Sequence, residues 1–342
     1  MNNSLFRLRS KIRNTLYHFK VANWTLIRNY NRSLCGTGFP PYAQLLLCSW
    51  RHGATFESYY EFCFFRKNTQ ERRTYVTPSL RHELTRQVND DASSLVLKDK
   101  EAFALLFKDM LGRKVLSYKQ LVLLQSTTPA PPNLVVKKRF GQAGDGVFFP
   151  GQFDTWAELF EYIEDTCENP DMYIFEEYIE QHHLLNRINP GSVNTLRIVT
   201  YYNEVSDEAE IWGVHIRFGV DSAVDNLATG GIGAFIDIEE GVCKSAVKKD
   251  PFSPDYDRHP VTNEKIIGLK IPYYSESINM AKEAAKKVKK VKSIGWDVAI
   301  TENGPCLIEG NDNWCMVSLQ ICEGKGMRNL ASAVCDMQMV YD

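Results

Sequence analysis

Apolar runs bounded by polar turns are clearest in the C-terminal half of the chain. Four runs rich in Val, Ile, Leu, Tyr and Trp predict β-strands at residues 193–203, 209–220, 294–301 and 306–313. A short polar turn separates the first two runs and "ENGP" separates the last two, so each pair predicts an antiparallel hairpin. Residues 275–292 repeat apolar side chains every three or four positions, which predicts a helix with a lysine-rich face toward solvent.

The middle of the chain mixes both periods. Residues 93–98 indicate a strand, and a helix then begins near Lys100. The segment 133–149 is typical of a strand, a glycine-rich turn and a second strand. A helix with Asp154 as its N-cap follows, and another strand is predicted at 172–179. This mixture predicts an α+β fold.

The N-terminal part is basic. The first 56 residues contain eight Lys and Arg and no Asp or Glu, a charge of +8. Because the total charge is −2, the rest of the chain carries about −10. Residues 1–34 predict an amphipathic helical arm with an apolar stripe and basic residues largely beside it: Leu5, Leu8, Ile12, Leu16 and Phe19, with Arg7, Arg9, Lys11 and Arg13. Residues 35–95 indicate a small mixed segment whose topology the pattern leaves open.

Two interpretations of the arm remain open. Its stripe could pack on the domain behind it, or residues 5–32 could make a peripheral contact with an anionic membrane. Nucleic acid is disfavoured as a partner because no recognisable motif of exposed aromatic residues accompanies the charge.

Composition excludes several classes of protein. The chain of 342 residues has the apolar and charged fractions of an ordinary globular protein. Its nine cysteines form no C-x-x-C pair, which favours reduced thiols over a disulfide framework or a zinc site. The sequence shows neither an apolar run long enough to span a bilayer nor a signal-peptide pattern. We therefore expect a cytoplasmic protein.

A magnesium site is predicted at the end of the last strand. Glu309 and Asn311 are two positions apart and so share one face of that strand, and Asp297 lies on the preceding strand of the hairpin. Carboxylate and amide oxygens are the ligands that Mg²⁺ prefers, with substrate phosphates completing the shell.

Phosphate-binding groups are predicted in the middle of the chain. Gly141, Gly144 and Gly146 would let backbone N–H groups cup phosphate oxygens, although such a turn is also an ordinary structural device. Of Lys137 and Lys138, only one can face the phosphates because they point to opposite sides of their strand.

Two arginines lie inside apolar runs farther along the chain. Arg197 and Arg217 either neighbour buried acids or bind a phosphate or carboxylate ligand. The segment "DNLATGGIGAF" adds the amide of Asn226 and a glycine turn at Gly230 and Gly231.

The order of these segments resembles the ATP-grasp superfamily, and most closely its sugar-transfer-associated family. The resemblance covers roughly residues 95–320 through "DKEAFALLF", "VVKKRFGQAGDGV", "FEEYI", "SVNTLRIVT", "IRFG…DNLATGG" and "WDVAITENGPCLIEGNDN". It implies two α+β subdomains that clamp ATP. The expected domains are the arm at 1–34, a pre-ATP-grasp segment at 35–95, a lid subdomain at 96–180 and a catalytic subdomain at 181–342.

The resemblance also implies residue roles. Lys100 and Lys137 would contact the ATP phosphates, and Asp297, Glu309 and Asn311 would hold Mg²⁺. Adenine and ribose would lie against a hinge composed of Glu176, Glu177, Tyr178, Ile179 and His183. Lys138 stands where the family commonly has proline, and His183 stands where related ligases often place a ribose-binding acid.

The resemblance implies a ligase that joins a carboxylate to an amine through an acylphosphate. Arg217 and Asn226 match the arginine and asparagine of peptide-tailoring glutamate ligases and would contact the transferred phosphate, with weaker expectations for Arg197 and for Asn194, Gly230 and Gly231 near the substrate. The expected substrates are a small carboxylate, such as a carboxylated sugar, a glycan precursor or an amino acid, and an amine. The alternatives are a kinase that stops at a phosphorylated product and a nucleotide-binding accessory protein of a glycan assembly machine.

Overall fold

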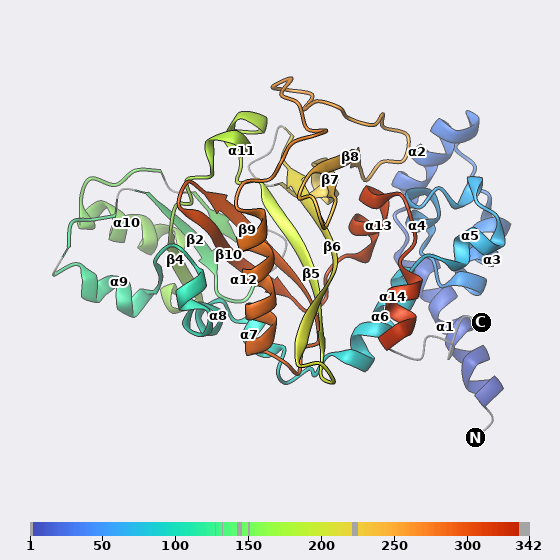
Figure 1. Ribbon diagram of the computed structural model, residues 1–342, viewed down its shortest axis with the longest axis horizontal. Helices are drawn as coiled ribbons and strands as arrows, with labels where there is room; N and C mark the ends of the chain where they lie inside the picture. Colours follow the sequence, from blue (N-terminus) through green and yellow to red (C-terminus); the bar gives the residue numbers. More distant parts are fainter. Residues whose placement is uncertain are drawn as a thin grey trace.

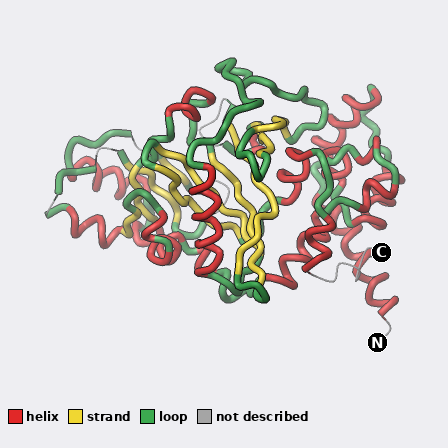
Figure 2. The backbone as a smooth tube through the Cα atoms, in the orientation of Figure 1, coloured by secondary structure: helices red, strands yellow, loops and turns green. Residues whose placement is uncertain are grey.

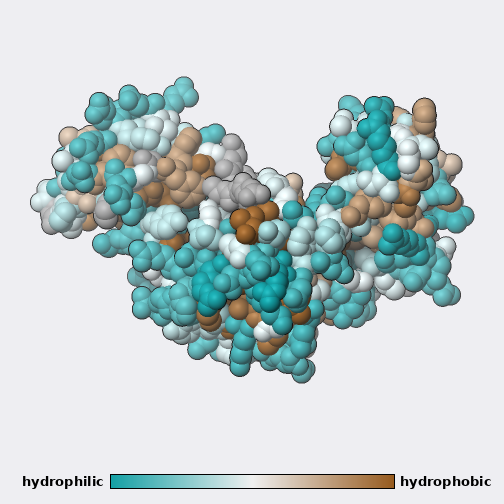
Figure 3. All heavy atoms as spheres, turned by 90° about the horizontal axis from the view of Figure 1, so that it is seen from above, coloured by the Kyte–Doolittle hydropathy of each residue, from teal (hydrophilic) through white to brown (hydrophobic). Residues whose placement is uncertain are grey.

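The computed structural model describes residues 3–126, 128–131, 133–141, 146–149, 151–220 and 225–334, with side chains from residue 8 onward. Three parts lie side by side, as Figure 1 and Figure 2 show: a helical lobe at one end, a small lid sheet at the other, and a large central sheet between them. Seen from above, the helical lobe and the lid project on either side of a hollow (Figure 3).

The central sheet has six antiparallel strands. In spatial order these are β10 (Gly304–Asn311), β9 (Ser293–Thr301), β5 (Thr195–Asn203), β6 (Glu208–Phe218), β7 (Ile232–Ile236) and β8 (Cys243–Lys248). Helix α12 (Tyr274–Lys287) packs on one face, where Ala281 and Ala285 are fully buried. Both predicted hairpins and the lysine-rich helix are confirmed, although this helix ends at Lys287.

Strand register aligns the polar residues of the central sheet. Asp297 lies opposite Arg197 on one side and opposite Glu309 on the other. A bulge between Leu307 and Glu309 shifts the β9–β10 pairing, which brings Glu309 level with Asp297. A row of charged side chains therefore crosses an otherwise apolar sheet.

The lid sheet has four antiparallel strands, β1 (Val115–Ser117), β4 (Tyr173–Glu177), β2 (Leu134–Lys138) and β3 (Val147–Phe148). Its core includes Leu134, Val136 and Phe175 together with buried residues of α10 (Trp156–Thr166), and α9 (Tyr118–Leu124) packs beside it. The N-cap of α10 is Thr155 rather than Asp154, because the Thr155 hydroxyl and Glu158 form a capping box.

Residues 95–98 correct a sequence prediction. They form α7 (Leu95–Lys98), a helical turn, rather than a strand, and α8 (Lys100–Leu106) follows with Asp99 as its N-cap. So short an apolar run does not distinguish strand from helix. Phe107 packs edge-on against Trp296, so this segment shares the core of the central sheet rather than that of the lid.

The helical lobe combines both ends of the chain. Its N-terminal helices are α1 (Asn3–Val21), α2 (Trp24–Cys35), α3 (Tyr42–His52), α4 (Phe56–Glu61), α5 (Thr69–Arg73) and α6 (Pro78–Val88). From the C-terminal side, α13 (Met316–Glu323) and α14 (Arg328–Val334) pack against them (Figure 1). The segment 42–95, expected to be mixed, is built of helices.

The remaining elements are short. They are α11 (His183–Ile188) and the 3₁₀ helices η1 (Phe64–Arg66), η2 (Lys108–Met110), η3 (Pro170–Met172) and η4 (Leu227–Thr229). Among the helices that the structure describes, none combines the length and the apolar character needed to cross a bilayer.

Candidate active site

A cavity of about 380 Å³ lies where the lid meets the edge of the central sheet. Its polar lining comes from both sides: Lys100, Arg113 and Glu176, and Glu309 and Asn311 of β10. Apolar side chains complete the wall, including Leu97, Phe103, Val115 and Ile308. An apolar cavity of this size with a few convergent polar groups is typical of a small-molecule site.

On the lid side, Glu176 lies between two cations. Its Oε2 atom accepts hydrogen bonds from an Arg113 nitrogen and from Lys137 Nζ, both at 2.8 Å. Burial alone would raise the pKa of Glu176, but Arg113 and Lys137 outweigh this effect and lower the pKa to about 2. We call these three residues the lid cluster. It carries one more positive than negative charge.

Lys137 and Lys138 face opposite sides of β2, as predicted. Lys137 reaches Glu176 at the cavity, whereas the stem of Lys138 lies against Gly146. A Cβ atom at Gly146 would meet Lys138 carbons at 2.5 Å, and the φ of this glycine is +67°. Gly146 is thus required by both packing and backbone conformation.

Lys100 stands at the start of α8 beside the glycine-rich turn. Its Nζ atom donates to the Gly141 carbonyl at 2.7 Å, and Arg139 ties the same turn to Asp99. Burial lowers the pKa of Lys100, while Glu309 acts in the opposite direction. Gly144 lies outside the described residues.

On the central sheet, Asp297 also lies between two cations. Both guanidinium groups bind its Oδ2 atom, Arg197 at 3.0 Å and Arg217 at 2.9 Å. Burial opposes ionisation, but Arg197 and Arg217 lower the pKa of Asp297. Both arginines therefore have a buried acidic neighbour.

Glu309 gives this side a second carboxylate. Asn311 Nδ2 donates to Glu309 Oε1 at 3.1 Å, so the two side chains share a face as the strand period predicts. Burial and then the charge of Asp297 raise the pKa of Glu309. A cation between the carboxylates would relieve their repulsion, and the three oxygen-bearing side chains suit Mg²⁺.

Arg217 joins the carboxylates to the loop before η4. Its guanidinium donates to Thr195 Oγ1 at 3.0 Å and lies 3.6 Å from Asp225. We call Asp297, Glu309, Asp225 and the two arginines the sheet cluster. Asn226 follows Asp225 directly, and its Oδ1 atom accepts the N–H of Ala228.

Gly230 and Gly231 shape the same loop. Gly230 ends η4 with a φ of +94°. A Cβ atom on Gly231 would lie 2.9 Å from the Asn226 carbonyl oxygen. These glycines therefore shape the backbone around Asn226.

The predicted hinge is divided: Glu176 lines the first cavity, whereas the residues after Glu177 line a second cavity of about 440 Å³. Tyr178, Ile179 and His183 lie in its wall, while Glu177 accepts the backbone N–H of Lys114. The wall also contains Glu302, from the turn between β9 and β10.

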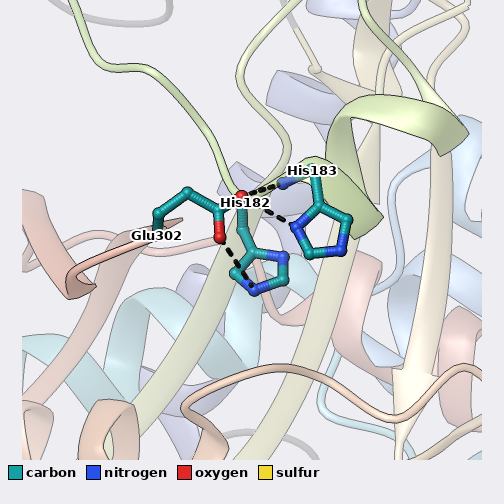
Figure 4. A group of neighbouring side chains, drawn as sticks. All are labelled: His182, His183 and Glu302. Carbon is teal, nitrogen blue, oxygen red and sulfur yellow. Dashed lines mark hydrogen bonds and ion pairs between the residues drawn. The ribbon is translucent and has the colours of Figure 1, made fainter.

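Glu302 contacts both His182 and His183. Its Oε1 atom accepts hydrogen bonds from the backbone N–H and from Nδ1 of His183, at 2.7 and 2.8 Å (Figure 4). Its Oε2 atom lies 3.6 Å from His182 Nε2. The ligand atoms of the three side chains lie within 4.8 Å of one another. However, His182 Nδ1 accepts the N–H of Leu184, which leaves the proton on the nitrogen that faces Glu302. The trio is therefore a hydrogen-bonded cluster rather than a preformed metal site.

None of the three predicted substrate residues, Asn194, Gly230 and Gly231, lies in the lining of either cavity. Asn194 is fully buried, and its amide nitrogen donates to Gln181 Oε1 and to the carbonyls of Leu185 and Asn189. Its described contacts hold the segment after the hinge in place.

Several residues of the site were not predicted. Arg113, Thr195, Asp225 and Glu302 were given no role from the sequence, although the last three lie inside segments that carry the family resemblance. His215 lies opposite Arg197, fully buried, and its Nδ1 atom has no hydrogen-bond partner. The one signal in the sequence for a buried His215 was its position inside an apolar run.

Comparisons with known proteins bear on this geometry. Residues 79–336 match the family described as "Sugar-transfer associated ATP-grasp". No curated protein matches the sequence. The expected family and the ATP-grasp fold class are confirmed.

Solved structures resemble the chain at low identity. The ATP-grasp ligase PsnB, complexed with a minimal precursor, has 11% identity and a TM-score of 0.43, over 72% of this chain and 63% of its own. The D-alanyl-alanine synthetase A of Vibrio cholerae has 13% identity and a TM-score of 0.43, over 71% and 65%. The N5-carboxyaminoimidazole ribonucleotide synthetase of Thermotoga maritima has 13% identity and a TM-score of 0.39, over 68% and 48%. This chain thus spans less than two thirds of each of them.

Proposed function

Because this chain belongs to the sugar-transfer-associated ATP-grasp family, we propose that it is an ATP-dependent ligase that joins a carboxylate to an amine. One observation carries the proposal: Arg113 and Glu176 of the net-positive lid cluster and Glu309 of the carboxylate-rich sheet cluster line one cavity, and the remaining members of each cluster lie behind them. Phosphoryl transfer depends mainly on positioning and on neutralising phosphate charge, and this arrangement supplies both.

In the proposed reaction, a substrate carboxylate oxygen attacks the γ-phosphorus of ATP. The bond to ADP breaks and an acylphosphate forms. The amine then attacks the acyl carbon, phosphate leaves with the bonding electrons, and the nitrogen loses a proton. The products are an amide, ADP and phosphate.

We assign the residues as follows. Lys100, Lys137 and the backbone at Gly141 and Gly146 bind phosphates, and hinge residues 176–179 with His183 bind adenine and ribose. Asp297, Glu309 and Asn311 hold Mg²⁺, which neutralises phosphate charge when bound. Arg217 and Asn226 contact the transferred phosphate, while Arg197 orients Asp297.

The proposed carboxylate substrate is a carboxylated sugar, a glycan precursor or an amino acid, consistent with the sugar-transfer association in the family's description. The test is hydroxylamine trapping across uronic acids and amino acids. Hydroxylamine intercepts an acylphosphate, so the correct carboxylate should give a hydroxamate together with ADP and phosphate.

Arg217→Lys sharpens this test because it keeps the charge beside Asp225 and Asp297 but loses the planar fork. Hydroxamate formation should fall by about 10²–10³, with the ATP-induced thermal shift retained. Arg187→Lys, at an exposed surface pair, is the matched control.

Two other outcomes would contradict the ligase assignment. ADP with a stable phosphorylated product and no hydroxamate would identify a kinase. ATP binding without turnover on any carboxylate of the panel would favour an accessory nucleotide-binding protein.

A further inference from the structure

Helix α1 packs on the helical lobe through its polar side. His18 is buried, and its two ring nitrogens contact the hydroxyls of Ser49 and Ser79 at 2.8 and 3.2 Å. Lys11 and Thr15, which precede His18 by seven and three positions, are half-buried on the same side. The inward face of this helix is therefore its hydrophilic one.

The apolar stripe of α1 lies beside this inward face, where the Phe19 ring packs 6.2 Å from that of the buried Phe56, and the stripe stays about half exposed. Leu8, Ile12, Leu16 and Phe19 remain 45%, 44%, 65% and 47% exposed. Their spacing at positions i, i+4, i+8 and i+11 places them in one line along the helix. A scattered exposed leucine needs no explanation, but a continuous apolar line indicates an interaction surface.

The stripe continues across the lobe. The ring of Phe19 lies 5.0 Å from that of Trp24, which lies 5.6 Å from Tyr42. Tyr42 is 42% exposed, and Leu46, one turn further along α3, is 38% exposed. We call this surface the arm face: Leu8, Ile12, Leu16, Phe19, Trp24, Tyr42 and Leu46.

The charge beside the arm face is positive. Arg9, Arg13 and Lys20 are exposed and, at 100° per residue, lie along the outer flank of the stripe. The first acidic residue of the chain is Glu57, which accepts the N–H of Asn23 at the start of α2. An apolar line bordered by cations is the pattern of a helix that lies in the plane of a membrane interface.

We propose that the arm face docks on an anionic lipid surface, with α1 parallel to the bilayer and its apolar side chains at the headgroup–acyl boundary. A second copy of the chain would bring the same cations against each other. A nucleic acid would use the charges but would leave the leucines exposed. The proposal does not depend on the ligase assignment.

Vesicle sedimentation of the full chain tests the proposal. We expect the protein to pellet with phosphatidylcholine–phosphatidylserine vesicles, but weakly with phosphatidylcholine alone, and to release as salt rises, because salt screens exposed charges over about 8–10 Å. The triple change Arg9→Gln, Arg13→Gln and Lys20→Gln should weaken binding about 100-fold, since each basic residue contributes about fivefold. Ile12→Ser with Leu16→Ser should abolish binding to the anionic vesicles.

Matched controls lie on other surfaces. Leu123→Ser removes a 72%-exposed apolar residue of the lid, and Lys265→Gln with Lys270→Gln removes exposed charges elsewhere; both should bind vesicles as the unaltered chain does. Unchanged thermal midpoints would show that the arm variants fold. Equal pelleting with neutral and anionic vesicles would overturn the proposal. The proposal would also be overturned if the arm variants lost self-association or RNA binding but bound vesicles as before.

Discussion

The lid cluster and the sheet cluster share one design and differ in one respect. In each, a buried carboxylate lies between two cationic side chains, Glu176 between Arg113 and Lys137 and Asp297 between two arginines. The sheet cluster has further carboxyl groups and the lid cluster has none. The same motif therefore leaves a surplus of positive charge on the lid and of carboxylates on the sheet.

This difference gives the cavity a polarity. Anionic groups are favoured against the lid and a divalent cation is favoured against the sheet, which is the order that a metal-bound polyphosphate requires. The two arginines of the sheet cluster keep Asp297 ionised despite its burial. In the lid cluster, the ion pairs hold Lys137 against Glu176, which lines the cavity.

Breaking the lid cluster should have the largest effect. Arg113→Leu removes a nearly inaccessible cation and should destabilise the fold by about 3 kcal/mol, because Glu176 keeps its charge with one partner fewer. Urea unfolding measures this. Adding Glu176→Leu should restore most of the loss, whereas Arg187→Leu on the surface should change stability by less than about 0.5 kcal/mol. A double variant no more stable than Arg113→Leu would contradict the ion-pair explanation.

Breaking the sheet cluster should remove a metal-dependent effect. ATP with Mg²⁺ at about 100 times its dissociation constant should stabilise the protein by about 2.7 kcal/mol. Asp297→Asn with Glu309→Gln should abolish the part that depends on Mg²⁺, as measured by thermal shift with and without a chelator. Glu204→Gln, at an exposed ion pair, is the control. An unaltered Mg²⁺ response in the double variant would remove the metal assignment.

The two lysines of β2 sharpen the assignment on the lid. Lys137→Met should weaken ATP binding roughly tenfold or more, since a hydrogen bond to a charged group contributes about 1.5–3 kcal/mol. Lys138→Met should alter it far less, because Lys138 packs against Gly146. Calorimetric titration distinguishes the two, and equal losses would mean that both lysines approach the nucleotide.

Acid should affect the two clusters differently. The pKa of Glu176 is lowered from 4.5 to about 2. Its ionised form therefore stabilises the folded protein fully above about pH 4.5, and this stabilisation is lost as the pH falls from 4.5 toward 2. Between about pH 5 and 3.5 this amounts to about 1–2 kcal/mol. Urea midpoints should show a smaller acid loss for Glu176→Gln than for the unaltered protein.

The sheet cluster should show a smaller net effect of acid. The pKa of Asp297 is lowered while that of Glu309 is raised, so the two contributions to stability oppose each other as the pH falls. Asp297→Asn with Glu309→Gln should therefore change the acid slope less than Glu176→Gln does. An equal or larger change would show that the two clusters titrate alike.

Local pattern was enough to predict that Asp297, Glu309 and Asn311 lie together. Strand period places Glu309 and Asn311 together, and hairpin pairing brings Asp297 beside them, so short-range rules determine three neighbours. Arg113 and Asp225 come from segments 63 residues before Glu176 and 30 residues after Thr195. No periodicity encodes such contacts, because they depend on how the lid and the sheet pack.

The errors have similar causes. Residues 93–98 were predicted as a strand because so short an apolar run cannot reveal its period. For the arm, the sequence identified the apolar stripe but could not say which side faces the protein. That depends on two serines, Ser49 and Ser79, whose hydroxyls reach His18 from α3 and α6.

Because α13 and α14 pack into the helical lobe, the core of this lobe is complete only after they have been synthesised. Gln320 donates to the carbonyl of Val76 and accepts its N–H, at 2.9 and 2.8 Å, across 244 residues of sequence. Trp314 and Leu319 fill the same core beside Leu80 and Leu84. During synthesis, the core around Val76, Leu80 and Leu84 therefore stays incomplete until Trp314 and Leu319 have been made, and its apolar surface stays exposed to chaperones in the interval.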